Sequence, residues 1–251
     1  HMTVQVRVTE GFGTAARGTA SAEDERSLMA CAPLDCSEIL VDLPYELDFS
    51  QDHGKIPAGN GPGTGFTYID QPSSGTGYLP EKLNLNTGGS GTLSINTTAG
   101  IMSTDANSQD NALGVGIDAP SQVSVLTTTL INLPGTSGKY EQAGLWFGND
   151  EDNYVKVEAV SSSSGKYKVE ILLEVNGAHP YSKVTSTLNL PPDASLTLRM
   201  RVNPGDKTIS GSYRINNGPF NQVGSTTAPA EFFSFDAAGI DPTIGTRSFG
   251  G

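Results

Sequence analysis

Residues 149–153 read "NDEDN", a cluster in which every side chain is a carboxylate or an amide. Clustered carboxylates and amides could supply the two acids of a glycosidase, the oxygen ligands of a calcium ion, or the residues of a tight turn. The D-x-[DN]-x-[DN]-G spacing of a calcium loop is absent, and Asp and Asn favour turns. The sequence therefore favours a plain hairpin turn here over a metal site.

Other catalytic arrangements find little support in the spacing of the residues. A retaining glycosidase needs two carboxyl groups about 5–5.5 Å apart, whereas Glu151 and Asp152 are neighbours within the expected turn. A serine nucleophile needs a histidine base, and neither His53 nor His179 stands in a recognisable motif. These patterns argue against an enzyme.

The expected turn joins two runs that alternate between apolar and polar residues, as strands do. If residues 149–153 form the turn, Leu145 faces Val157 and Phe147 faces Val155, and this face is the core. A one-residue slip would place charged side chains in the core, so the register is well specified. The opposite face then carries Trp146, Tyr154, Lys156 and Glu158.

The following run, "KYKVEILLEV", alternates in the same way and continues the sheet. After the loop "SSSSG", the charges on the polar face come out complementary, because Lys156 meets Glu170 and Glu158 meets Lys168. Sugars are held by an aromatic ring with polar groups around it. The face around Trp146, extended by Lys168 and Glu170, is therefore a candidate carbohydrate-binding surface. The alternative is that a loop covers Trp146.

The composition predicts an all-β fold. Among 251 residues, Gly (30) and Pro (15) are plentiful and charged residues make up only 17%, which favours many short strands joined by turns. A dozen or so strands without helical partners predicts a sandwich of two antiparallel sheets. One helical turn is expected in "PAEFFSFDAAGI". Strands are expected near 38–49, 64–70, 92–96, 111–118, 121–131, 194–203 and 207–215.

The net charge and the hydropathy exclude two classes of partner. A net charge of −12 would repel the polyanionic backbone of nucleic acid, so nucleic-acid binding is not expected. No apolar run reaches the ~18 residues needed to cross a membrane, so membrane insertion is not expected either.

Residues 1–37 are expected to lie ahead of the main domain, which would span 38–251. "HM" is typical of a cloning tag, "TVQVRVTE" alternates as the last strand of a preceding module would, and 11–30 lacks periodicity, as linkers do. Cys31 and Cys36 could form a small disulfide loop, remain free thiols or supply half of a zinc site. The shortage of further ligands favours the disulfide and an oxidising, extracellular compartment.

Three pieces of the sequence resemble the concanavalin A-like lectin/glucanase superfamily, especially its laminin-G-like extracellular modules. They are "LPYELDFSQD", "YEQAGLWFGNDEDNYVKVEAV" and "SLTLRMRVNPGDKTISGSYRINNGPF", and the likeness covers residues 40–250. The resemblance implies a jelly-roll sandwich with one structural Ca²⁺ near the opening and closing strands, for which Asp48 and Asp236 are the candidates. Hydrolases of this fold carry E-x-D-x-x-E or E-x-D-x-E on one strand, which Glu151, Asp152 and Glu158 do not fit. Such modules close with a final strand, and the sequence reaches only "GTRSFGG" at that point.

Residues and resemblance together predict a non-catalytic, lectin-like carbohydrate-binding module of a larger secreted or cell-surface protein. Its partners would be a polysaccharide and neighbouring modules of the same chain. The alternative is a structural spacer domain of an adhesin, without a glycan ligand.

The resemblance also allows an enzyme, because the superfamily includes polysaccharide lyases and glycoside hydrolases, but both are less favoured. A lyase would use Tyr154 as acid and base, and Arg199 or Arg201 to neutralise a uronate. The favoured interpretation is that Tyr154 packs beside a neighbouring strand while the two arginines lie on a solvated face.

Overall fold

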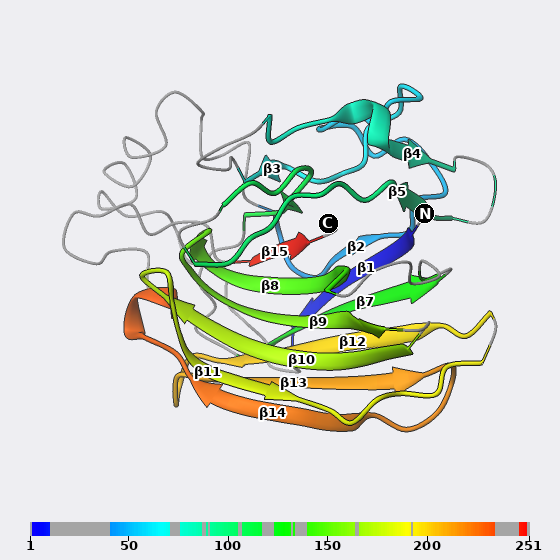
Figure 1. Ribbon diagram of the computed structural model, residues 1–251. Coiled ribbons are helices and arrows are strands. Elements are labelled where there is room, and N and C mark those ends of the chain that lie inside the picture. The colour runs from blue at the N-terminus through cyan, green and yellow to red at the C-terminus, as the bar shows by residue number, and fades with distance from the viewer. Residues whose placement is uncertain are drawn as a thin grey trace, which may run out of the picture.

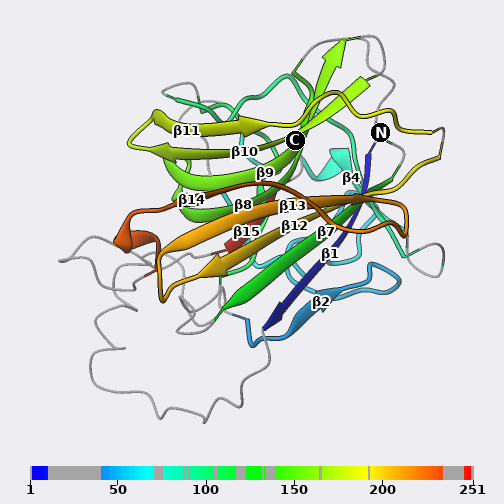
Figure 2. The ribbon, with the colours of Figure 1, turned by 90° about the horizontal axis from the view of Figure 1, so that it is seen from below.

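A computed structural model shows an all-β sandwich of two antiparallel sheets (Figure 1). Seen from below, the two sheets form separate layers (Figure 2). The structure describes residues 2–10, 41–70, 76–86, 89, 91–104, 107–116, 123–131, 133, 140–163, 166–191, 193–233 and 246–249. Over these ranges, no helix is long and apolar enough to span a bilayer. The predicted fold class, all-β with two antiparallel sheets, is confirmed.

The larger sheet has eight strands. A short strand, β2 (Tyr45–Leu47), pairs with the second half of its most N-terminal strand. The other seven lie in the order β14 (Asn221–Thr227), β13 (Thr208–Ile215), β12 (Leu196–Asn203), β7 (Ser124–Ile131), β1 (Met2–Glu10), β5 (Leu93–Ile95) and β4 (Leu83–Leu85).

The smaller sheet has five strands, in the order β11 (Ala178–Val184), β10 (Lys166–Val175), β9 (Asn153–Ser163), β8 (Gln142–Asp150) and β15 (Thr246–Phe249). A separate two-stranded sheet pairs β3 (Tyr68–Ile69) with β6 (Leu113–Gly114). Two single-turn 3-10 helices complete the described elements: η1 (Pro80–Lys82) and η2 (Ala230–Phe233). The second lies within the run in which the sequence predicts a helical turn.

Alternation along each strand decides which side chains enter the core between the sheets. On β12, Leu198 and Met200 are fully buried, whereas Arg199 between them is half-buried and Arg201 is exposed. Such period-2 patterning is what a strand with one solvated face requires. The middle of β8 differs, because it is buried on both faces. Its sequence, "AGLWF", accordingly reads as a continuous run of small and apolar residues.

The β8–β9 hairpin has the predicted register. Leu145 lies opposite Val157 and Phe147 lies opposite Val155, and all four side chains enter the core. The strands end at Asp150 and resume at Asn153, which confirms a hairpin turn within residues 149–153. Asp150 Oδ1 stabilises the turn, because it accepts hydrogen bonds from the backbone N–H of Asp152 and the side chain of Asn153, each at 2.9 Å.

The predicted register between β9 and β10 is wrong by two residues. Lys156 lies opposite Leu172, not Glu170, and Glu158 lies opposite Glu170, not Lys168. β9 extends to Ser163 and β10 begins at Lys166, so the connection is shorter than the predicted loop, and a register shift lies between Lys166 and Tyr167. Because the slip is an even number of residues, every side chain stays on its predicted face.

The N-terminal strand lies inside the sandwich. β1 was expected to end a preceding module, but it pairs with β7 over eight positions on one edge, and with β5 and β2 on the other. It is therefore an interior strand of the larger sheet (Figure 1). The expected linker at 11–30 and the Cys31–Cys36 disulfide fall outside the described residues.

Candidate functional site

The outer face of the smaller sheet is covered by a segment of chain, which we call the cover segment (residues 101–104 and 107–112). Met102 and Ala112 of this segment pack on Trp146, Tyr154 and Leu172 to form a second apolar cluster. The two aromatic rings meet edge to face, with centroids 6.3 Å apart and an interplanar angle of 77°. The smaller sheet thus has apolar packing on both sides.

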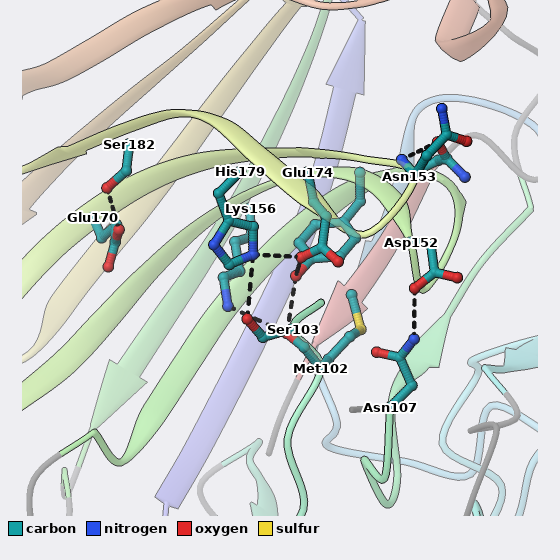
Figure 3. Close-up of polar contacts among 12 residues, drawn as sticks. Met102, Ser103, Asn107, Asp152, Asn153, Lys156, Glu170, Glu174, His179 and Ser182 are labelled. Carbon is teal, nitrogen blue, oxygen red and sulfur yellow. Dashed lines mark hydrogen bonds and ion pairs between the residues drawn. The ribbon is translucent and has the colours of Figure 1, made fainter. Parts of the chain in front are cut away.

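Polar side chains hold the cover segment in place (Figure 3). Asn107 donates to Asp152 Oδ1 at 2.7 Å in the β8–β9 turn, and Gln109 donates to Asp70 Oδ2 at 2.9 Å. Asn111 bonds both backbone groups of Leu79 through its side-chain amide. The amide side chains of the segment are therefore its anchors.

This cover overturns the predicted carbohydrate-binding face. Trp146 and Tyr154 are 0% exposed, Lys156 is 4% exposed and Glu158 is 1% exposed. Because these side chains are beneath the cover segment, they cannot contact a sugar ring. Lys168 and Glu170 are half-buried on β10. The alternative interpretation, in which a loop covers Trp146, is the one that the structure shows.

The buried charges on this face pair within one strand. Lys156 Nζ lies 3.2 Å from Glu158 Oε1, two residues along β9, and also 3.2 Å from Gln142 Oε1. Burial raises the pKa of Glu158, and the facing carboxylate of Glu170 raises it further, while Lys156 acts in the opposite direction. A carboxyl group that favours its proton is suited to acid catalysis, but its burial withholds it from a substrate.

A second polar cluster connects β9, β10, β11 and the cover segment (Figure 3). The hydroxyl of Tyr154 lies 2.7 Å from Glu174 Oε2 and 2.9 Å from the carbonyl oxygen of Met102. His179 Nε2 lies 2.8 Å from the same Glu174 oxygen and 3.2 Å from Ser103 Oγ. Burial first, and then the charge of Glu174, hold the pKa of Tyr154 well above its ordinary value.

Ser103, His179 and Glu174 do not form a catalytic triad. In a triad the acid binds one imidazole nitrogen while the other nitrogen takes the proton from serine. Here both neighbours lie on Nε2, so the proton path from serine to histidine is missing. Tyr154, the predicted acid and base of a lyase, cannot reach a substrate because it is fully buried. The cluster therefore fastens the cover segment to the sheet.

The described part of the structure does not bring the two predicted calcium ligands, Asp48 and Asp236, together. Asp48 follows β2 with its side chain 56% exposed, and its Oδ1 lies 3.0 Å from both the backbone N–H of Ser50 and His53 Nε2. These hydrogen bonds hold the pKa of Asp48 below its ordinary value. Asp236 lies outside the described residues. Within the described ranges, no three His, Cys, Asp or Glu side chains form a group that could hold a metal ion.

The outer face of the larger sheet presents a different set of groups. Alternation directs Arg199 of β12 and Arg214 of β13 away from the core. Arg214 lies opposite Thr197, which is two residues before Arg199 on the same face, so the two arginines are diagonal neighbours. The connection from β13 to β14 then brings Phe220 back over them. We call Arg199, Arg214 and Phe220 the arginine–phenylalanine face.

Short contacts define this face. The guanidinium carbon of Arg199 lies 3.4 Å from the centroid of the Phe220 ring, and that of Arg214 lies 5.0 Å from it. The turn that carries Phe220 is held at its base, because Asn216 Oδ1 accepts a hydrogen bond from the backbone N–H of Ser195 at 3.0 Å. Partial burial, and then the neighbouring charge of Arg214, lower the pKa of Arg199.

The surroundings of this face are polar. Several outward-facing side chains on β7, β12 and β13 carry small hydroxyl groups, and all three members of the arginine–phenylalanine face are half-buried. Two of those hydroxyl groups, Thr129 Oγ1 and Thr197 Oγ1, lie 3.1 Å apart across β7 and β12. An aromatic ring among hydrogen-bonding groups is the usual composition of a sugar-binding surface.

Sequence reasoning missed Phe220. The stretch "YRINNGPF" contributes only to the resemblance, and Arg199 is predicted to lie on a solvated face, with a role in a lyase as the alternative. The sequence did carry a signal for this face. Each of the two runs that form β12 and β13 has an arginine at an outward position, and an aromatic residue, Phe220, follows the second run. Strand alternation finds the arginines, but the path of the turn is needed to place the ring.

No protein-family model and no curated protein matches the sequence. One similar solved structure is a GH43_12 protein retrieved from a capybara gut metagenome, with 16% identity, a TM-score of 0.44, and coverage of 63% of this chain and 30% of that one. Another is a GH43 protein from Bacillus licheniformis, with 18% identity, a TM-score of 0.44, and coverage of 64% and 30%. A third, a functionally unknown protein from Saccharomyces cerevisiae, shows 14% identity, a TM-score of 0.41, and coverage of 61% and 74%.

The chain spans 30% of the length of each of these two GH43 proteins, and the likeness is one of fold. The face on which a lectin site was predicted is buried. The prediction of a non-catalytic, lectin-like module is therefore wrong.

Proposed function

We propose that this chain holds a polysaccharide substrate as part of a carbohydrate-active enzyme, and that the outer face of the larger sheet is the holding surface. The observation that carries the proposal is the ring of Phe220, which lies on a sheet face of arginine and hydroxyl side chains. Sugar rings stack on aromatic rings and take hydrogen bonds from such groups.

The position of the ring supports this choice of surface. Phe220 is half-buried and carried by a turn whose base is fixed by Asn216, so the ring is held ready for a ligand. The one tryptophan is beneath the cover segment and is not available as a second stacking ring. The large apolar residues that are clearly exposed among the described residues, Ile101, Tyr140 and Val184, come from three separate segments of the chain.

The finer points of the sequence interpretation belong to the same proposal. The sandwich would be a concanavalin A-like jelly roll, and the protein would work outside the cell beside neighbouring modules, where a Cys31–Cys36 disulfide is stable. A structural calcium ion would bind Asp48 and Asp236. Chelation with EDTA should then lower the melting temperature, since an ion that binds only the folded state stabilises it; an unchanged melting temperature in EDTA would remove calcium from the proposal.

Affinity electrophoresis tests the holding surface. The chain is run through gels that contain one polysaccharide each, neutral or acidic, and we expect at least one polymer to retard it. Phe220→Ala should abolish the retardation, because stacking is lost, whereas Phe220→Tyr should keep it. Tyr140→Ala is the matched control, since this ring is 75% exposed but lies on the other sheet's side of the molecule, next to β8.

Two results would count against the proposal. The first is full retardation of Phe220→Ala, with an unchanged melting temperature, by a polymer that retards the wild type. The second is the absence of retardation by every polymer tested. A melting curve for each variant separates loss of binding from loss of folding.

A further inference from the structure

Two positive charges on the arginine–phenylalanine face share one ring, and among the described residues no carboxylate lies within ion-pair distance of either. The guanidinium carbons of Arg199 and Arg214 lie 3.4 Å and 5.0 Å from the Phe220 centroid, and their like charges raise the energy of each other's charged form.

This arrangement is unusual for so acidic a protein. The chain has 27 acidic and 15 basic residues, a net charge of −12, so a carboxylate could readily stand next to an arginine. Arg201, the next outward residue on β12, shows the contrast, because the pKa of Asp206 is lowered first by hydrogen bonds from Thr208 and then by the charge of Arg201. The pair at Arg199 and Arg214 is thus a local positive site in a negative molecule.

Both guanidinium groups also have a donor without an acceptor. The Nε atoms of Arg199 and Arg214 are buried from solvent and make no hydrogen bond with the described residues. A buried donor without an acceptor costs free energy until a partner arrives. An anion that approached the pair would meet two planar forks of N–H donors.

We infer that Arg199 and Arg214 form a subsite for the carboxylate of a uronic acid within the polysaccharide that the chain holds. This inference rests on the proposed function, because the sugar ring that bears the carboxylate would stack on Phe220. A planar carboxylate matches the two parallel N–H donors of a guanidinium group, and such charge-assisted bonds are the strong ones. The polymer class is therefore a polyuronate.

Three polymers separate the ligand chemistries. They are polygalacturonate, the same polymer after chemical reduction of its carboxyl groups, and dextran sulfate as an unrelated polyanion. Binding to each is measured by titration calorimetry of the full chain at low and high salt. We expect polygalacturonate to bind most tightly and to lose affinity as salt rises, because screening weakens exposed charge pairs.

Matched variants assign the binding to the pair. Arg199→Gln and Arg214→Gln should each weaken polygalacturonate binding by about tenfold or more, the range expected for loss of a hydrogen bond between charged groups. Arg199→Lys keeps the positive charge but loses the planar pair of guanidinium N–H donors, so it should retain only part of the wild-type affinity. Arg201→Gln, on the same face but near Asp206, is the control and should bind as the wild type does.

The possible outcomes are distinct. Equal binding of the native and carboxyl-reduced polymers, with both Gln variants unchanged, overturns the carboxylate subsite and leaves the proposed function standing. If the chain binds dextran sulfate but not polygalacturonate, the carboxylate subsite is also overturned, because the arginine pair would then bind sulfate groups. If the wild type binds no polysaccharide, the proposed function fails and this inference fails with it. Unchanged melting curves confirm that each variant is folded.

Discussion

Glu158 lies directly opposite Glu170 across the β9–β10 pairing, on the same face of the smaller sheet. Like charges in this relationship destabilise a sheet. Lys156 Nζ, at 3.2 Å from Glu158 on the same strand, offsets part of the repulsion. The remaining cost appears as a raised pKa of Glu158, which burial causes first and Glu170 increases.

The raised pKa predicts a pH-dependent effect of Glu158→Gln. The folded protein holds the Glu158 proton more tightly than the unfolded chain does, so this group's contribution to stability is full below the ordinary pKa of 4.5 and is lost as pH rises from there through the folded pKa. The Gln variant carries no such penalty. Its stability relative to wild type should therefore increase with pH above that value.

Urea denaturation of wild type and variant between pH ~4 and pH ~8 measures this difference. Glu231→Gln, at an exposed position of η2, is the control and should show a flat difference. A stability difference for Glu158→Gln that falls as pH rises would contradict the assignment of a raised pKa.

Trp146→Ala should lower the free energy of unfolding by about 3–5 kcal/mol, the usual cost of removing a large buried aromatic side chain. The ring is 0% exposed and packs edge to face on Tyr154 beneath the cover segment. Denaturant unfolding measures the loss. Tyr140→Ala, at a position 75% exposed, should stay within about 0.5 kcal/mol of wild type. A comparably small effect at Trp146 would show that the ring is not packed as described.

Tyr154→Phe keeps the ring and removes only the hydroxyl group. Glu174 and the carbonyl of Met102 then lose their shared donor inside the protein. We expect a loss of about 1–3 kcal/mol, the cost of a buried polar group left short of a partner. Chemical denaturation again gives the number, with Tyr140→Phe as the exposed control. Equal stability of Tyr154→Phe and wild type would mean that water reaches this cluster.

Gly144→Ala should disrupt the smaller sheet. A Cβ atom at Gly144 would lie 2.2 Å from the carbonyl oxygen of Val157 and 2.5 Å from Cα of Glu158, both backbone atoms that cannot move aside cheaply. The expected cost is at the upper end of the range for overpacking, about 3 kcal/mol. Gly205→Ala is the matched control, since its Cβ would meet only the side chain of Asn203, at 3.4 Å. Similar melting temperatures for the two variants would contradict the close approach of β8 and β9.

Parts of the fold that depend on local pattern were predictable from the sequence. The β8–β9 register follows from apolar pairs such as Leu145 and Val157, because a slip would bury charge. Alternation along β12 likewise predicts the outward positions of Arg199 and Arg201, which are half-buried and exposed. In both places, the decisive partners lie within one hairpin.

The predictions failed where the decisive partner lies elsewhere in the chain. Alternation predicts that Lys156 and Glu158 lie on an exposed polar face. The charges of Lys168 and Glu170 on β10 then predict the β9–β10 register. The cover segment, some forty residues earlier, buries that face instead, and no periodicity in its sequence reveals the contact. Once the face is buried, Lys156 pairs along its own strand, and a register shift sets the β9–β10 alignment.

The place of β1 in the larger sheet has a consequence for how the protein is made. The residues of β1 leave the ribosome well before β7, which supplies their longest run of backbone partners. Closing so large a loop is entropically costly and slows folding. The amide and carbonyl groups of β1 must therefore wait until β7 has been translated before the sheet can form around them. We expect maturation to be limited by this late pairing of β7 with β1.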